Sequence, residues 1–272
     1  MIEHHYRPPE GFVDIPFIYV FDGRTQTPGA SPENLLVRIQ AEDFYLRSVV
    51  GMNTCAGTWR YYEASQSPAM SALQTATARY TVVPEKFYPA LSGIKLDLGT
   101  VAIATNPSAL DVGFIGFQGV KRVAEGQFAW ANYKTDYQYY EKQFQYTLDL
   151  NLNFYADAGA GVQRNGVRIN NYDFELQAIQ IRRTDTDEVY GADTFLVNLY
   201  DPSGYNALST APMPMRWLNQ FQPNNFFSLF PAPALVYPLN SRINLDITSL
   251  LNAAEGPRTY EIVFQGVERV QC

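Results

Sequence analysis

Histidine is nearly absent from this sequence. The only two, His4 and His5, are neighbours near the N-terminus. Adjacent residues of an extended chain point to opposite sides, so they make a poor metal-binding pair. Without a central histidine, no Ser-His-Asp or Cys-His arrangement can form, and neither standard glycine-rich phosphate loop occurs. We therefore expect no enzyme, no metal site and no cofactor.

Cysteine, long apolar runs and an excess of positive charge are also lacking. Cys55 and Cys272 are too few for a disulfide framework, which favours two reduced thiols. The N-terminal segment has no apolar stretch typical of a signal peptide, and no run of about 18 apolar residues could span a membrane. A net charge of −7 opposes binding to phosphate. We expect a soluble protein made in a cytoplasm, with neither nucleic acid nor membrane as partner.

Aromatic and apolar residues are abundant. Apolar residues make up 46% of the 272 positions and aromatic residues 14%, which favours a packed core with many strands. The clearest strand is "FQYTLDLNLNF" at 144–154, where apolar and polar residues alternate without a break. Such a period of two indicates a strand with one face in a core and one in water.

One heptapeptide occurs twice. "FQGVKRV" begins at Phe117 and "FQGVERV" begins at Phe264, and six of the seven positions agree. The one difference, Lys121 against Glu268, reverses a charge, which is easy on a solvated face and hard in a core. Gly119 and Gly266 lie within the motif, so we expect a β-bulge or a close backbone approach there.

Two further pairs of segments repeat in the same order. "VRIQAEDFYLRSV" at Val37 matches "VRINNYDFELQAI" at Val167, and "YPALSGIKLDL" at Tyr88 matches "YPLNSRINLDI" at Tyr237. These collinear matches predict an all-β chain of two tandem antiparallel β-sandwich (jelly-roll-like) domains arising from an internal duplication. The predicted parts are an N-terminal arm at 1–14, copy one at 15–123, an aromatic linker at 124–144 and copy two at 145–272.

The repeated residues are interpreted as positions of the fold. Asp43–Phe44 and Asp173–Phe174 could each offer a ligand carboxylate, but a side chain that hydrogen-bonds turn backbone beside a core Phe is favoured. Pro89 and Pro238 follow Tyr88 and Tyr237, and we expect them at strand entries, where proline is tolerated.

Two aromatic-rich segments are candidate contact surfaces. The linker carries Trp130, Tyr137 and Tyr139, and either packs between the domains or contacts another subunit. An insertion in copy two, around 209–234, reads as an elaborated loop. Its candidate docking residues are Trp217, Phe221, Phe226, Phe227 and Phe230.

The ordered set of motifs resembles a known class of proteins. A leading alternating strand, the Asp-Phe segments, "FLVNLYDPSG" at 195–204, the Tyr-Pro segments and the closing heptapeptide together are similar to β-sandwich structural proteins of tailed-bacteriophage virions. This chain departs from them by carrying two copies, and copy one has "GTWRYYEASQSP" in place of the 195–204 motif.

The resemblance implies a non-enzymatic structural subunit that docks multivalently in a virion assembled in the host cytoplasm. It would be a capsid decoration protein or a neck or collar component at the head-tail connection. The implied partners are capsid, portal or neck subunits and copies of the chain itself, and no catalytic residues are implied. The alternative is a receptor- or carbohydrate-binding β-sandwich module of a phage tail or cell surface, and an enzyme ranks third.

Overall fold

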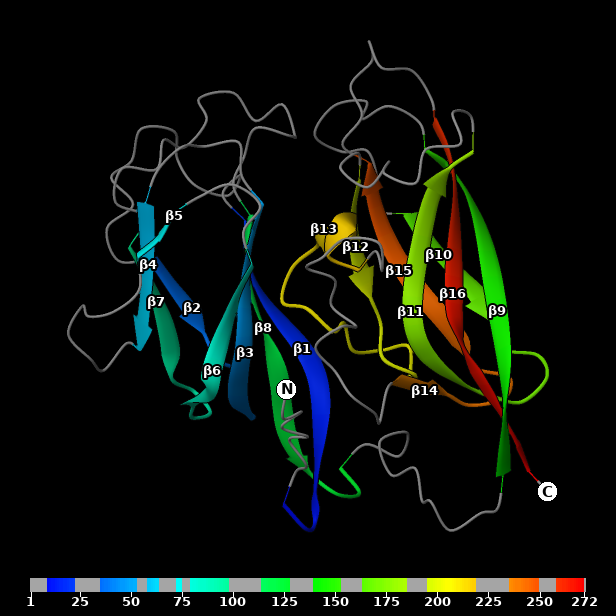
Figure 1. The fold of residues 1–272 in the computed structure, drawn as a ribbon, viewed down its shortest axis with the longest axis horizontal. Helices are drawn as coiled ribbons and strands as arrows, with labels where there is room; N and C mark the ends of the chain where they lie inside the picture. Colours follow the sequence, from blue (N-terminus) through cyan, green and yellow to red (C-terminus); the bar gives the residue numbers. More distant parts are fainter. Residues whose placement is uncertain are drawn as a thin grey trace. The chain divides into compact units, whose positions relative to one another are not determined.

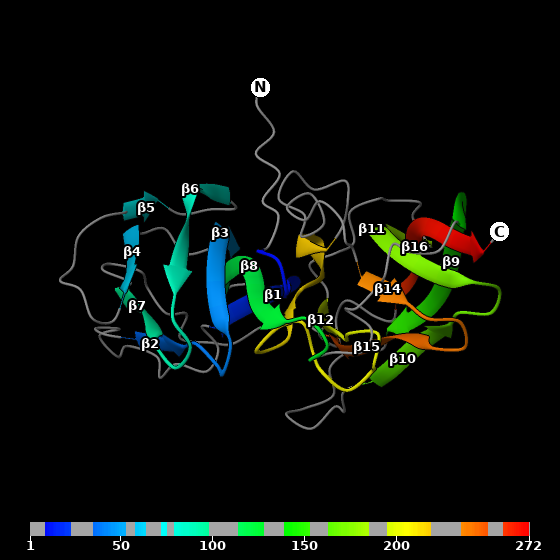
Figure 2. The same cartoon turned by 90° about the horizontal axis from the view of Figure 1, so that it is seen from below.

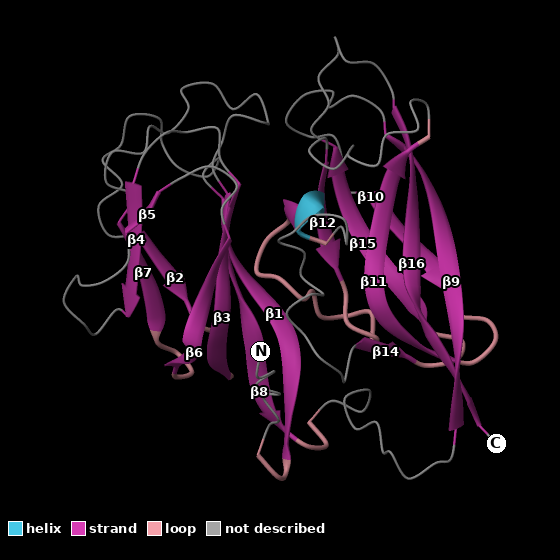
Figure 3. Ribbon diagram, viewed as in Figure 1, coloured by secondary structure: helices cyan, strands magenta, loops and turns pink. Residues whose placement is uncertain are grey.

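The computed structural model describes residues 9–22, 35–52, 58–63, 72–74, 79–97, 114–127, 139–152, 163–184, 195–218, 235–249 and 258–271. These residues are almost entirely strands and the turns between them, apart from one 3-10 helix, η3 (Met215–Trp217) (Figure 1, Figure 3). The first half contains β1 (Phe12–Asp22), β2 (Leu35–Arg38), β3 (Asp43–Met52), β4 (Thr58–Glu63), β5 (Ala72–Gln74), β6 (Arg79–Tyr88), β7 (Gly93–Asp97) and β8 (Phe114–Ala124). The second half contains β9 (Tyr139–Leu152), β10 (Gln163–Arg168), β11 (Asp173–Arg183), β12 (Phe195–Leu199), β13 (Met213–Pro214), β14 (Leu235–Tyr237), β15 (Arg242–Ser249) and β16 (Arg258–Gln271).

Each half forms two four-stranded sheets with the same strand order. The first half has the orders β1-β8-β3-β6 and β2-β7-β4-β5, which Figure 2 shows as two layers. The second half has β9-β16-β11-β14 and β10-β15-β12-β13. Each strand of the second half thus takes the place of the strand eight positions earlier. Eight strands in two packed sheets with this crossing order make a jelly roll, so the predicted fold class is confirmed.

The register of the strands repeats as well. Phe44 pairs with Tyr88 between β3 and β6, and Phe174 pairs with Tyr237 between β11 and β14. The pairing of β3 with β6 is irregular between Leu46 and Ser48, whereas the pairing of β11 with β16 is irregular between Leu176 and Ala178, so the two irregularities involve different strand pairs. The matching Phe–Tyr pairs at corresponding positions of the two halves support the duplication.

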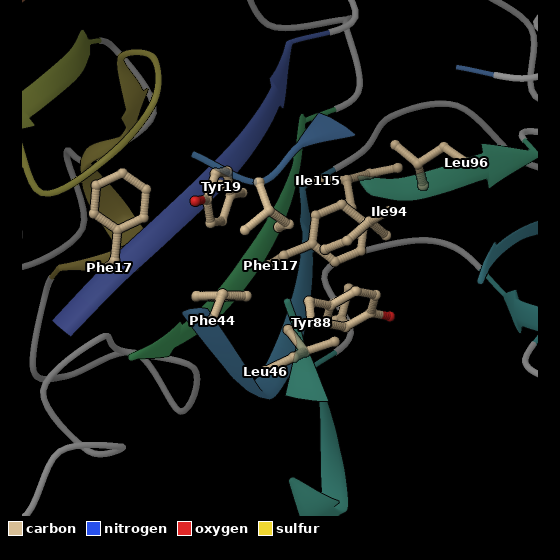
Figure 4. Packing of buried hydrophobic residues seen from close by; sticks show 11 residues of the cluster. Phe17, Tyr19, Phe44, Leu46, Tyr88, Ile94, Leu96, Ile115 and Phe117 are labelled. Atoms are coloured by element: carbon tan, nitrogen blue, oxygen red, sulfur yellow. The ribbon is translucent and has the colours of Figure 1, made fainter. Parts of the chain in front are cut away.

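The core of the first jelly roll is a cluster of aromatic and branched side chains between its two sheets (Figure 4). Tyr19 packs edge-on against Phe17 and Phe44, with ring centroids 4.9 and 4.8 Å apart. In the second jelly roll, Tyr146 packs in the same way against Phe144 and Phe174, at 4.9 and 5.0 Å. Edge-to-face geometry is the favoured arrangement for such pairs, and its repetition identifies β9 as the equivalent of β1.

The chain divides into two compact units. One comprises residues 1–15, 122–208 and 215–272, and the other comprises residues 16–121 and 209–214. A short stretch that follows β12 in the sequence, 209–214, therefore belongs with residues 16–121. This stretch lies within the region that the sequence indicated as an elaborated loop.

Candidate functional site

The repeated aspartates support turns. Asp43 Oδ1 accepts a hydrogen bond from the Ala90 N–H (2.9 Å), and Asp173 Oδ1 accepts one from the Leu239 N–H (2.7 Å). Phe44 and Phe174, the residues after them, are fully buried. Each aspartate thus ties the start of one strand to a turn beside a core phenylalanine, which is the structural role favoured from the sequence.

The Tyr-Pro segments occupy the ends of strands, which corrects the expected strand entry. β6 ends at Tyr88 and β14 ends at Tyr237, and both tyrosines are buried. Pro89 and Pro238 begin four-residue turns, since their carbonyl oxygens accept hydrogen bonds from the N–H groups of Ser92 (3.1 Å) and Ser241 (2.9 Å). Proline lacks the N–H that would continue a ladder, so it marks the exit of the strand equally well.

The glycines of the repeated heptapeptide allow a close backbone approach. A Cβ on Gly119 would lie 2.1 Å from the Tyr45 carbonyl oxygen, and a Cβ on Gly266 would lie 1.9 Å from the Glu175 carbonyl oxygen. In β11, the shift of register falls beside Gly266, so the irregularity lies on the facing strand. Phe117 and Phe264, two residues earlier in each motif, are fully buried in equivalent strands, β8 and β16.

The position that changes charge between the copies is buried in both, which corrects the expected solvated face. Lys121 is 9% exposed and Glu268 is 0% exposed. The swap is accommodated because the partners have changed with the charge.

In copy one, the partners of Lys121 suit a cation. Its Nζ lies 3.2 Å from Glu42 Oε2, donates to Gln40 Oε1 (2.6 Å) and sits 3.7 Å from the centroid of the Phe17 ring. Burial lowers the pKa of Lys121, and the neighbouring Glu42 opposes that shift. A carboxylate, an amide oxygen and an aromatic face together replace the water that the ammonium group loses.

In copy two, the partners of Glu268 suit an anion. Its Oε1 accepts hydrogen bonds from the Tyr146 hydroxyl (3.2 Å) and from Asn171 Nδ2 (3.1 Å). Lys142 Nζ lies 4.0 Å from Oε2. Because each copy holds the charge with its own set of partners, we interpret this position as structural.

A tyrosine hydroxyl in each copy binds the backbone of the turn between strands two and three of its jelly roll. The Tyr19 hydroxyl accepts from the Gln40 N–H (2.9 Å), and the Tyr146 hydroxyl accepts from the Asn170 N–H (3.3 Å). Burial raises the pKa of Tyr19 to about 12 and also raises the pKa of Tyr146. Both hydroxyls therefore stay protonated at neutral pH, as donors or acceptors in the frame of the fold.

A surface cluster on the second jelly roll joins three strand regions. Arg164 on β10 donates to both carboxylate oxygens of Asp246 on β15, at 2.7 and 3.0 Å, and to the hydroxyl of Tyr200 (3.0 Å). The Tyr200 hydroxyl also donates to Asp246 Oδ2 (2.5 Å). The Arg164 hydrogen bond lowers the pKa of Asp246. No sequence motif indicates this cluster, because its residues are far apart along the chain and only the sheet order joins them.

The loop after Tyr200 is held by a buried aspartate. Asp201 accepts hydrogen bonds from the Ser203 hydroxyl (2.5 Å) and from Asn206 Nδ2 (2.9 Å), and its own N–H donates to the Asn206 carbonyl (2.8 Å). The loop presents Tyr205, which is 87% exposed. An exposed aromatic ring on an ordered loop can provide a flat contact for a ligand or a partner.

The predicted docking residues fall into two groups. Trp217 lies in η3 and is only 2% exposed, so the expectation of an exposed side chain there is wrong. Met215 and Leu218, beside it in the sequence, are buried too. Tyr139 is the first residue of β9, where it pairs with Gln271. The others, Trp130, Tyr137, Phe221, Phe226, Phe227 and Phe230, lie outside the described residues.

Among the described residues, no group of three or more His, Cys, Asp and Glu side chains could hold a metal ion. His4, His5, Cys55 and Cys272 lie outside that part of the chain. No helix within the described ranges is long and apolar enough to cross a membrane.

No protein-family model matches the chain, and no curated protein matches it. Three solved viral structures show a distant likeness. A chain in the atomic structure of Sulfolobus Turreted Icosahedral Virus is 12% identical to this chain, with a TM-score of 0.25. The match covers 97% of this chain but only 61% of the viral chain. The major capsid protein of bacteriophage PM2 is 9% identical with a TM-score of 0.23, covering 95% of this chain and 97% of that one. VP54 of PBCV-1, fitted into a reconstruction of the virophage Sputnik, is 11% identical with a TM-score of 0.23, covering 99% and 97%. Values this low are no basis for assigning a function.

Proposed function

We propose that this chain is a non-catalytic structural subunit of a virus particle and acts by multivalent docking. The observation that carries the proposal is the repetition of one jelly roll, with the same strand order, register and turn contacts, in a single chain. Jelly rolls are frequent in viral capsid proteins, although fold analogy alone does not define function. A chain with two related outer surfaces suits a symmetric particle, which is assembled through repeated interfaces.

The resemblance of the motif order to tailed-phage virion proteins supports a finer placement. The chain would decorate the capsid surface or form part of the neck or collar, and capsid, portal or neck subunits would be its partners. Copies of the chain would contact one another in the particle. The residues that carry this resemblance, such as "FLVNLYDPSG" at 195–204, belong to the fold of the second jelly roll.

The docking element would be the part of the copy-two insertion beyond the buried segment. Residues 209–218 include a bridge to β1 and the buried Trp217, so they support the fold. Residues 219–234 contain Phe221, Phe226, Phe227 and Phe230. An isolated subunit that exposed so many aromatic side chains would risk aggregation, so a partner surface is expected to cover them.

The test replaces residues 219–234 by a short Gly/Ser linker and measures incorporation into particles. A matched control replaces residues 98–113, a segment of the same length without aromatic residues. We expect both variants to fold, and only the first to be depleted from purified particles. Wild-type incorporation of the first variant would remove 219–234 as the docking element, and its unfolding would show that these aromatics belong to the core.

A second candidate is a carbohydrate- or receptor-binding module, which the exposed Tyr205 favours. Its loop is ordered by Asp201, and an aromatic face is a common platform for a sugar ring. A glycan array probed with wild type and with Tyr205→Ala separates the candidates. Tyr205-dependent binding to host glycans would support the second candidate, and absence of binding would leave the structural role.

A further inference from the structure

A short segment at 209–210 contacts the outer edge of β1. Ser209 forms a parallel bridge with Ile18, and both belong to the same compact unit. The Thr210 N–H donates to the Ile18 carbonyl oxygen (3.1 Å), and Thr210 Oγ1 accepts from the Val20 N–H (2.9 Å). These contacts use the outward-facing backbone groups of an edge strand, which is how an extended peptide adds to a sheet.

The equivalent edge on β9 is open in the described part of the chain. Tyr146 takes the place of Tyr19, so Gln145 and Thr147 take the places of Ile18 and Val20. Ile18 and Val20 are buried, whereas Gln145 and Thr147 are exposed. β9 is last in its sheet, and its 14 residues include neither proline nor glycine. A long edge of this kind is a template for pairing with another chain.

Copy one carries a segment that matches the one contacting β1. "STAP" at 209–212 lies between β12 and β13, and "SQSP" at 65–68 lies between the equivalent strands β4 and β5. Ser65 corresponds to Ser209 and Pro68 to Pro212. Residues 65–68 lie outside the described residues, so their match to residues 209–212 rests on their sequence and their position in the chain alone.

We propose that the open edge of β9 binds residues 65–68 of a second copy of this chain by parallel strand addition. This contact between two chains would be equivalent to the contact that Ser209 and Thr210 make with β1. Ser65 would lie opposite Gln145, the Gln66 N–H would donate to the Gln145 carbonyl oxygen, and the Gln66 side-chain oxygen would accept from the Thr147 N–H.

The contact joins two different surfaces, so it is heterologous and propagates from chain to chain until a ring closes. The exposed side of β9 carries Gln143, Gln145, Thr147 and Asp149, which suits a polar, hydrated contact. This inference goes beyond the virion role, because it concerns the purified chain and holds in any assembly that the chain forms.

Disulfide trapping between two differently tagged chains tests the register. Both carry Cys55→Ser and Cys272→Ser; one adds Ser65→Cys and the other adds Gln145→Cys. A control pair replaces Gln145→Cys by Asp149→Cys on the same side of β9, about 13 Å further along the strand and beyond the Cα separation of about 7 Å that a disulfide can bridge. We expect a mixed disulfide with Gln145→Cys and none above background with Asp149→Cys. Equal trapping in both pairs, or dimers of the Gln145→Cys chain with itself at the same rate, would overturn the proposal.

A proline in β9 provides an independent measurement. By equivalence with Val20, whose N–H donates to Thr210 Oγ1, we expect the Thr147 N–H to point away from β16. Thr147→Pro then removes the proposed donor without removing a bond of the β9–β16 ladder, and Thr147→Val keeps that donor. Circular dichroism shows whether each variant is folded. In sedimentation velocity we expect wild type and Thr147→Val to self-associate and folded Thr147→Pro to lose self-association. Association of all three to the same extent would contradict the proposal, and if the proline variant unfolds, the trapping result decides.

Discussion

Leu91 and Asn240 occupy the same third position of the turns that begin at Pro89 and Pro238. Both have positive φ, 64° and 67°, a region that asparagine and glycine adopt readily and leucine does not. Asn240 therefore suits its turn, whereas Leu91 is strained there and is 84% exposed, so packing does not offset the strain.

Leu91→Asn is expected to stabilise the chain by about 1 kcal/mol, because it relieves the left-handed strain and loses little packing. The reciprocal change, Asn240→Leu, should destabilise by a similar amount and also lose the hydrogen bond that Asn240 Oδ1 accepts from Arg168. Urea unfolding of both variants measures the two effects. A Leu91→Asn variant no more stable than wild type would show that the turn does not strain Leu91.

Lys121 and Glu268 show how a charge can be exchanged within a core. We expect Lys121→Glu to destabilise by about 3–5 kcal/mol, because it sets a second buried carboxylate beside Glu42 and removes the cation that now pairs with Glu42. Lys121→Met, which keeps an apolar stem without the charge, should cost less. Equal unfolding free energies for Lys121→Glu and wild type would mean that the side chain reaches solvent.

The raised pKa of Tyr19 predicts a pH dependence with a definite sign. The unfolded tyrosine ionises near pH 10, whereas the folded tyrosine stays protonated to about pH 12. The contribution of Tyr19 to the free energy of unfolding is therefore complete below pH 10 and is lost as the pH rises toward 12. Tyr19→Phe should therefore make the fall of unfolding free energy between these pH values shallower by about one proton. Unfolding titrations at several alkaline pH values provide the measurement, and identical slopes would contradict the assignment to Tyr19.

At the scale of elements, the two closing strands place equivalent phenylalanines in two cores. Phe117→Ala and Phe264→Ala should each destabilise the chain by about 3–5 kcal/mol, the usual cost of removing a buried phenylalanine. Phe87→Ala is the control, since Phe87 on β6 is 45% exposed, and it should cost less. Thermal unfolding compares the three, and a melting temperature unchanged by Phe117→Ala would place that ring outside the core.

The elements themselves were largely predictable from the sequence. The alternation at 144–154 is confirmed in β9, where Tyr146 and Leu150 are buried while Gln145, Thr147 and Asp149 are exposed. Alternation of apolar and polar residues follows directly from the burial of one face, so a half-buried strand can be predicted from the sequence alone. The sequence does not show that Pro89 follows a strand and does not begin one, because proline is acceptable at either end of a strand.

Contacts between distant segments account for what the sequence did not reveal. The burial of Lys121 and Glu268 depends on Glu42 and Lys142, which different strands and turns contribute. The Arg164–Asp246–Tyr200 cluster needs the order of β10, β15 and β12, and motif order along the chain does not give sheet order. The sequence predicts a loop around Trp217 because the surrounding insertion is rich in proline and asparagine, and only the fold shows that its side chain is buried.

At the scale of the whole molecule, the duplication explains both the similarity and the difference between the halves. Strand order, the Phe–Tyr pairs, aspartate-supported turns and tyrosine contacts are repeated, because the fold requires them twice. Buried charge and edge contacts differ, because they depend on what surrounds each copy. A chain of this kind presents two related surfaces that need not bind the same neighbour, which is the property that the proposed structural role uses.

The central claim, a structural subunit of a particle, is tested most directly by quantitative mass spectrometry of particles purified by density gradient from a culture that produces this chain. The account predicts that the chain bands with the particles in several copies each, at a ratio to the other particle proteins that stays fixed across fractions and repeated purifications. A chain found only in the fractions free of particles, or at a ratio that falls with each purification step, would contradict it.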